Sequence, residues 1–143
     1  MRVGPFPALM YDEANSTVQT VSDIIETDWR SAILNSPEPE ITRKIFDAWD
    51  LAVANSNLPR RLGPILRRIG FGALRVEAIP VLNASYSEHS FSAGMLENFS
   101  NSAIKQNLIT TEDAQSWRGG IEALIELEEY FFCVNRFLFS AIK

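Results

Sequence analysis

Apolar and polar residues alternate between residues 18 and 27, and this pattern predicts a β-strand. After Ser36-Pro37 the apolar positions change to helical spacing. Serine is a good N-cap and proline is tolerated in the first turn, so this dipeptide indicates a helix start. The apolar stripe of the predicted helix consists of Ile41, Ile45, Ala48, Trp49, Ala52 and Val53.

A second helix is predicted from about Pro59, and Gly70 can supply the left-handed residue that commonly closes a helix. The stretch 73–82 has the composition of a strand, in which Pro80 marks an edge position or the strand's end. The predicted strand over 73–82 therefore follows the two predicted helices directly.

Two more helical faces follow, and the second one opens at Thr110–Asp113, which resembles a capping box. Gly119-Gly120 is unfavourable inside that helix, so we expect either close packing against a neighbour or a kink. The aromatic run over 130–142 predicts a last strand. The apolar residues of the two helical faces are Phe91, Met95, Phe99, Ala103 and Leu108, then Ala114, Trp117, Ile121, Leu124 and Ile125.

The elements follow in the order strand, two helices, strand, two helices, strand. This order indicates an α/β chain that resembles an α+β fragment. Residues 1–17 contain Pro5, Pro7 and a polar run, so we expect an irregular N-terminal arm. Residues 18–143 are expected to form a single domain, because 143 residues suffice for one hydrophobic core.

The composition is that of an ordinary globular protein, with 46% hydrophobic and 22% charged residues. A net charge of -5 argues against a nucleic-acid partner, and Arg60, Arg61, Arg67 and Arg68 are interpreted as a solvated helix flank. No apolar segment approaches the roughly 18 residues that a membrane span needs, and the N-terminus is a poor signal peptide. We therefore predict a cytoplasmic protein without a membrane partner.

Few residues are of the types that carry out catalysis or bind metals. Cys133 is the single cysteine and lies in an apolar run, which favours a buried hydrophobe over a reactive thiol. His89 is the single histidine, and a loop or cap residue is favoured over a catalytic one. The sequence supplies no catalytic trio, no phosphate-binding loop and no helical pair of metal ligands, so we predict no catalytic, cofactor-binding or metal-binding residues.

Five segments occur in an informative order: ETDW, LPRRLGPILRRIGF, LRVEAIPVL, TTEDAQSWRGGIEAL and YFFCVNRFLFSAIK. In this order they resemble the second half of class I S-adenosylmethionine-dependent methyltransferases of the ubiquinone/menaquinone and arsenite methyltransferase-like kind. The resemblance covers roughly residues 20–143. It implies a small mixed sheet of three strands with about four helices, in which the final two strands form an antiparallel hairpin.

The chain departs from that family where the methyl donor binds. Family members hold S-adenosylmethionine on a glycine-rich turn after their first strand. The G-x-G here, Gly70-Phe71-Gly72, follows a helix and precedes a strand, which is the wrong context. We therefore expect no cofactor on this chain alone, and S-adenosylmethionine only if a complementing partner exists.

The resemblance also implies an acceptor cleft. Asp28 and Trp29 would stand at its rim, although Trp29 could equally plug the end of the sheet while Asp28 caps the next turn. Arg136 could hold an acidic ligand, but pairing with Glu77 or Glu26 is favoured. The candidate substrate-binding residues are Asp28, Trp29, Tyr86, His89, Phe91, Met95, Trp117 and Arg136.

Three functions follow. The first is a truncated methyltransferase-like protein, not catalytic alone, that binds a small apolar or amphipathic molecule in a residual cleft. The second is the acceptor-binding half of a split methyltransferase, and the third is a dimeric interaction module without a ligand. The strand at 18–27 would expose an unpaired edge unless the N-terminal arm or a second copy covered it, and we expect a homodimer through this edge.

Overall fold

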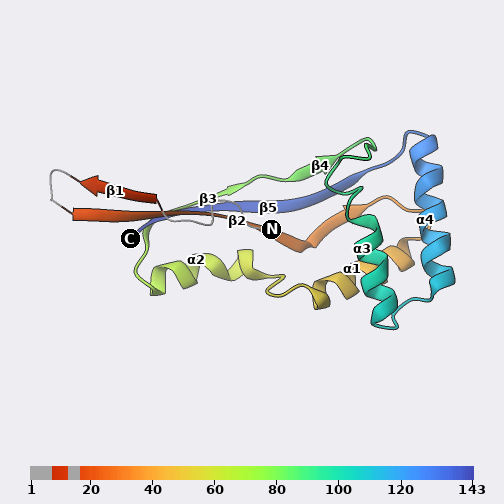
Figure 1. Ribbon diagram of the computed structural model, residues 1–143, viewed down its shortest axis with the longest axis horizontal. Helices are drawn as coiled ribbons and strands as arrows, with labels where there is room; N and C mark the ends of the chain where they lie inside the picture. The colour runs from red at the N-terminus through yellow and green to blue at the C-terminus, as the bar shows by residue number, and fades with distance from the viewer. Residues whose placement is uncertain (1–7, 13–16) are drawn as a thin grey trace. The chain divides into compact units, whose positions relative to one another are not determined.

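The computed structural model describes residues 8–12 and 17–143, which form an α+β fold (Figure 1). Within these residues there are four helices and five strands. The helices are α1 (Pro39–Ala52), α2 (Leu58–Arg68), α3 (Leu96–Lys105) and α4 (Thr111–Glu126). The strands are β1 (Ala8–Asp12), β2 (Thr17–Leu34), β3 (Gly72–Ala78), β4 (Val81–Asn83) and β5 (Phe132–Ile142).

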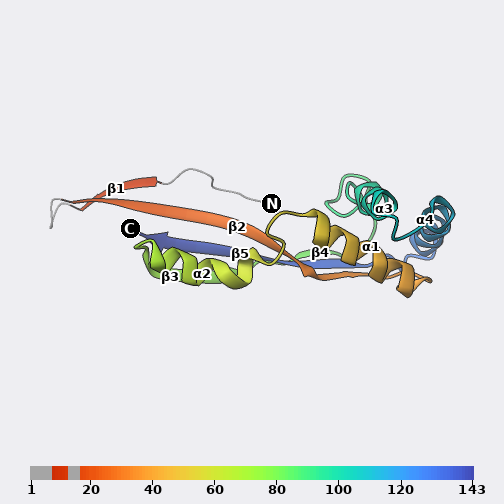
Figure 2. The same cartoon turned by 90° about the horizontal axis from the view of Figure 1, so that it is seen from below.

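The strands belong to one sheet in the order β1-β2-β5-β3, and β4 also pairs with β5. β1 is antiparallel to β2, and both β3 and β4 are antiparallel to β5. β2 and β5 run in opposite directions (Figure 2). The four helices and the antiparallel pairing of the last strands are thus confirmed for the described residues. The expected mixed sheet of three strands is wrong.

The sequence pattern missed strands at two places. The expected irregular arm contains β1, which pairs with residues 17–21 of β2. The segment ALMYD has no strong strand pattern of its own, and pairing with β2 provides its backbone partners. The predicted strand over 73–82 is two strands, β3 and β4, because Pro80 lacks the N–H that a continuous ladder requires.

β1 also bears on the predicted homodimer. Either the N-terminal arm or a second copy was expected to cover the outer edge of the strand at 18–27. The pairing of Ala8 with Val21 through Asp12 with Thr17 covers part of that edge within the chain. This observation favours the arm, and the homodimer stays a prediction that light scattering can test.

β2 continues seven residues beyond the end predicted for the strand at 18–27. The charged residues at positions 28 and 30 each have a partner on a helix. Asp28 Oδ2 accepts a hydrogen bond from Arg60 of α2 at 3.0 Å, and Arg30 Nε donates to Asp50 of α1 at 3.1 Å. Asp28 and Trp29 therefore lie within the strand instead of at its tip.

The chain divides into two compact units, and β2 and β5 each contribute to both. The described part of the first unit contains residues up to 28, then 57–80 and 135–143. Its core consists of Leu62 and Leu66 of α2 with Phe139 and Ala141 of β5. Gly70 closes α2 with φ 98°, as predicted, and the Phe71 N–H returns to the Leu66 carbonyl at 2.9 Å.

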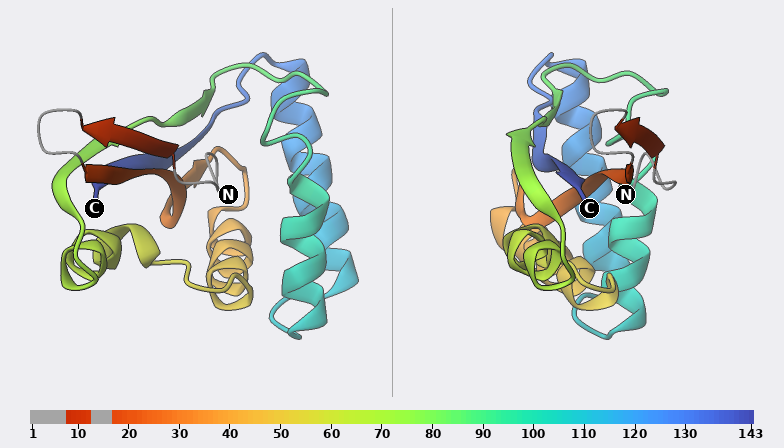
Figure 3. Two further views of the ribbon diagram at one scale, coloured as in Figure 1. Left: turned by 60° about the vertical axis from the view of Figure 1, so that its left-hand side comes forward. Right: turned by 90° about the vertical axis from the view of Figure 1, so that its left-hand side faces the viewer.

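The second unit contains residues 29–56 and 81–134, in which α3 and α4 lie side by side (Figure 3). Trp117 of α4 and Phe99 of α3 are fully buried in its core. The predicted capping box is confirmed, because the Thr110 hydroxyl accepts from Asp113 N while the Asp113 carboxylate accepts from Thr110 N. α1 begins at Pro39, two residues later than Ser36-Pro37 predicted, and the Ser36 hydroxyl accepts from Glu38 N at 3.0 Å.

The two glycines in α4 have different surroundings. A Cβ added to Gly120 would lie 3.1 Å from the ring of Pro37, whereas one added to Gly119 would meet nothing within 4 Å. Gly120 thus provides the predicted close packing. We expect Gly119→Ala to raise the free energy of unfolding by about 0.5–1 kcal/mol, since alanine is the better helix former.

Gly120→Ala is the matched control, because the same gain in helix propensity is opposed by the contact with Pro37. Urea unfolding followed by tryptophan fluorescence measures both variants, since Trp29, Trp49 and Trp117 all lie in the second unit. Equal stabilisation by the two substitutions would contradict the packing role assigned to Gly120.

Candidate functional site

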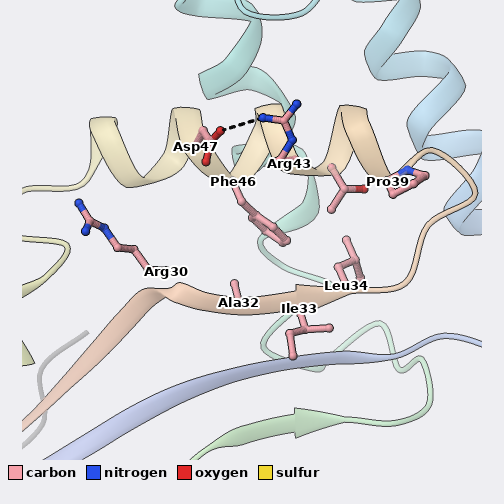
Figure 4. A pocket seen from close by; sticks show the side chains of 9 residues that line it. Arg30, Ala32, Ile33, Leu34, Pro39, Arg43, Phe46 and Asp47 are labelled. Atoms are coloured by element: carbon pink, nitrogen blue, oxygen red, sulfur yellow. Dashed lines mark ion pairs between the residues drawn. The ribbon is translucent and has the colours of Figure 1, made fainter.

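A groove runs between the end of β2 and α1 in the second unit (Figure 4). We call it the β2–α1 groove. It comprises two adjoining hollows of about 360 Å³ and about 320 Å³ that share Arg30, Ala32, Phe46 and Asp47. In Figure 4, Phe46 points from α1 toward β2, and Ala32 and Leu34 point back toward the helix. The floor of the groove is thus apolar, which is usual for small-molecule sites.

Charged groups surround this floor. Arg43 and Asp47 form an ion pair one helical turn apart at 3.8 Å, and both side chains are well exposed. The pair between Arg30 and Asp50 is more sheltered, since the Asp50 side chain is only 19% exposed. The second oxygen of Asp50, Oδ1, is buried and has no hydrogen-bond partner among the described residues. A buried carboxylate oxygen is costly to leave unpaired, so a hydrogen-bond donor that reached this atom would relieve that cost.

Local interactions hold the two walls of the groove in place. The connection from β2 to α1 is fixed at Asn35, whose backbone N–H donates to the Phe131 carbonyl at 3.0 Å. α1 is anchored by Ile45 and Ala48, which are fully buried. Thr42 adds a polar anchor, because its hydroxyl accepts a hydrogen bond from Trp117 Nε1 at 2.9 Å. Phe46 and Asp50, four residues apart, are therefore presented together on the side of α1 that borders the groove.

Four predicted site residues gather in one place, but as packed core. Trp29 and Trp117 are buried in the core of the second unit, and Phe91 and Met95 pack against it half-buried. The Trp29 ring stacks on Phe91 with centroids 6.0 Å apart. Of these four residues only Trp29 borders the groove. The expectation that aromatic residues at helical spacing would line a cleft overlooked that the same spacing serves a helix core.

Tyr86 and His89 lie in the loop region between β4 and α3. Tyr86 is 37% exposed, and its ring meets that of Tyr130 edge to face with centroids 5.3 Å apart. Tyr130 is buried, and its hydroxyl lies 2.6 Å from the Ser92 hydroxyl. Burial raises the pKa of the Tyr130 phenol above its usual value, so it stays neutral at physiological pH. The His89 side chain is 88% exposed beside Glu88, with Nε2 and Oε1 3.3 Å apart.

Asp28 and Arg136 belong to the first unit. Asp28 is buried and pairs with Arg60, so it does not cap the turn that follows the strand. Arg136 Nε donates to the Ile79 carbonyl at 3.4 Å, and no ion pair among the described side chains includes Arg136. Pairing of Arg136 with Glu77 is therefore not among these ion pairs, and pairing with Glu26 stays a prediction. A backbone carbonyl satisfies one guanidinium donor in place of a carboxylate.

The residues that line the groove were missed in the sequence. Phe46 falls outside the predicted apolar stripe of its helix, and Asp47 and Asp50 are polar positions between the members of that stripe. A large aromatic residue on the polar side of an amphipathic helix is the signal that could have identified this face. Arg30 and Ala32 carried no such signal, because the predicted strand ended before them.

In the part of the chain that the structure describes, no group of three or more histidine, cysteine, aspartate or glutamate side chains is arranged to hold a metal ion. None of the helices there combines the length and apolar character that crossing a bilayer requires. In comparisons with known proteins, no protein-family model and no curated protein matches the chain.

Proposed function

We propose that this chain is the acceptor-side part of a methyltransferase-like fold and that it binds a small amphipathic molecule in the β2–α1 groove. The proposal has two parts, descent and ligand binding. The antiparallel pairing of β3 and β4 with β5 supports the descent, because the resemblance predicts a hairpin of the last two strands. Fold-level kinship does not establish chemistry, so ligand binding is argued from the groove alone.

The observation that supports ligand binding most directly is the unsatisfied Asp50 Oδ1 beside the apolar floor of the β2–α1 groove. A ligand with an apolar body would cover Phe46, Ala32 and Leu34. A hydroxyl or amide N–H at its polar end would donate to Asp50 Oδ1, which has no other partner among the described residues. Desolvation of the floor and satisfaction of this oxygen both favour the bound state. A saturated alcohol of medium chain length combines both features and serves as the probe.

We expect 1-octanol to shift the backbone amide resonances of Ala32, Leu34 and Phe46 in a saturable manner, whereas octane-1-sulfonate, which lacks a donor, binds at least tenfold more weakly. Ala32→Phe fills the groove and should abolish these shifts. Leu51→Phe is the matched control, because Leu51 lies on the same helix as Phe46 and is 75% exposed outside the groove. Unchanged 1-octanol shifts in Ala32→Phe would refute the assignment.

Asp50→Asn provides a second, conservative variant whose shape is nearly that of the original residue. It replaces one acceptor oxygen by an amide, so the preference for the alcohol over the sulfonate should fall several-fold while the fold persists. An undiminished preference would show that Asp50 Oδ1 does not bind the probe.

The second part of the proposal concerns the methyl donor. The glycine-rich turn that would hold S-adenosylmethionine is absent from residues 1–143, so calorimetric titration of the purified chain should give no binding heat. If a separate donor-binding half completes a split enzyme, heat should appear only when that half is added. Stoichiometric S-adenosylmethionine binding by this chain alone would overturn the proposal.

A further inference from the structure

We propose that the outward face of α2 docks on a membrane surface that carries anionic lipids. This α2 arginine face consists of Arg60, Arg61, Arg67 and Arg68, all of them exposed. The other side of the helix is occupied: α2 lies against β3 (Figure 2), and its Leu62 and Leu66 are buried in the core of the first unit. Arg61, Arg67 and Arg68 are therefore held on a fixed helix, opposite the side that carries Leu62 and Leu66, whereas Arg60 reaches Asp28 of β2.

The charges on this face are not explained by the helix itself. α2 contains no acidic residue. Arg67 and Arg68 in the last turn interact favourably with the helix dipole, but Arg60 and Arg61 lie near its positive end, where cations are disfavoured. Arg60 is compensated by Asp28. Arg61, Arg67 and Arg68 form no ion pair with the described residues, so an external anion would relieve their mutual repulsion.

The shape of the face favours a lipid headgroup. A shallow hollow of about 200 Å³ is bordered by Arg60, Arg61 and Arg68, and its floor is formed by Pro64 and Ile65. Guanidinium groups around an apolar floor match a phosphate that carries an apolar chain. At the end of α2, Ile69 is 53% exposed and adds apolar surface.

A nucleic acid fits these observations less well. α2 has no aromatic side chain on which a base could stack. The chain as a whole carries a charge of -5, so a long polyanion that extended beyond the arginine face would meet an acidic protein. This inference departs from the sequence-based expectation of no membrane partner, and it is independent of the proposed ligand groove.

Sedimentation with vesicles tests the proposal. The protein should bind vesicles of equimolar phosphatidylserine and phosphatidylcholine, but not vesicles of phosphatidylcholine alone, and high salt should release it. Arg61→Gln combined with Arg68→Gln should weaken binding about thirtyfold, equivalent to ~2 kcal/mol, since each arginine near the surface contributes about fivefold. Both side chains are exposed, so circular dichroism should report an unchanged fold.

Lys44→Gln combined with Lys105→Gln is the matched control, because it removes the same charge from exposed positions in the second unit. Its vesicle binding should stay within about twofold of the unmodified protein. Equal loss in both double variants would overturn the proposal in favour of a general charge effect. Equal binding to neutral vesicles, or complete displacement by a short DNA duplex at the same phosphate concentration, would also overturn it.

Discussion

Replacing Trp117 by alanine is expected to lower the free energy of unfolding of the second unit by about 3–5 kcal/mol, the range for large aromatic residues in cores. Trp117 has no exposed surface, and its indole N–H is bonded to Thr42 of α1. The substitution opens a cavity between α1 and α4 and leaves a buried hydroxyl with one partner fewer. Urea unfolding followed by far-UV circular dichroism measures the loss, because α1, α3 and α4 all lie in this unit.

Trp117→Phe separates the contribution of packing from that of the hydrogen bond to Thr42. It retains an aromatic ring but removes the donor to Thr42, so we expect a smaller loss of about 1–2 kcal/mol. Leu51→Ala is the control, since Leu51 lies on α1 and is 75% exposed, and it should change stability by less than about 0.5 kcal/mol. A loss below about 1 kcal/mol for Trp117→Ala would contradict the central position of this residue in the core.

The second large effect is expected at the ion pair between Asp28 and Arg60 in the first unit. The Asp28 side chain is 8% exposed, so Arg60→Ala leaves a buried carboxylate without this cation. We expect a loss of about 2 kcal/mol, less than for a fully buried pair because the Arg60 side chain is 56% exposed. Amide hydrogen exchange of Val76 and Leu138, in the ladder between β3 and β5, reports on this unit separately.

A double-mutant cycle completes this test. Asp28→Asn removes the charge and keeps the shape, so the combined variant Asp28→Asn, Arg60→Ala should lose less than the sum of the two single losses. Arg61→Ala serves as the control, because Arg61 is adjacent but has no ion pair with the described residues. Strict additivity of the two substitutions would show that the contact does not stabilise the first unit.

Helix ends, whose interactions lie within a few consecutive residues, were predicted from the sequence. Gly70 closes α2 with a positive φ, and Thr110 and Asp113 form the capping box of α4. In each case the side chain or the missing Cβ acts on backbone groups no more than four residues away, so the local sequence carries the whole interaction. The presence of four helices and of strands near 18–27, 73–82 and 130–142 followed from the same local periodicity.

Only the tertiary structure decided the features that depend on a distant partner. β1 forms because β2 lies beside it, and β2 continues past Asp28 because arginine and aspartate side chains from α2 and α1 neutralise its polar residues. The same holds for the candidate site: Trp117 became packed core, whereas Phe46, which packs half-buried against that core, and Asp50 came to border a groove. Periodicity states which face of an element is apolar, but the free energy of burial depends on what that face meets, and this is fixed only when the whole chain folds.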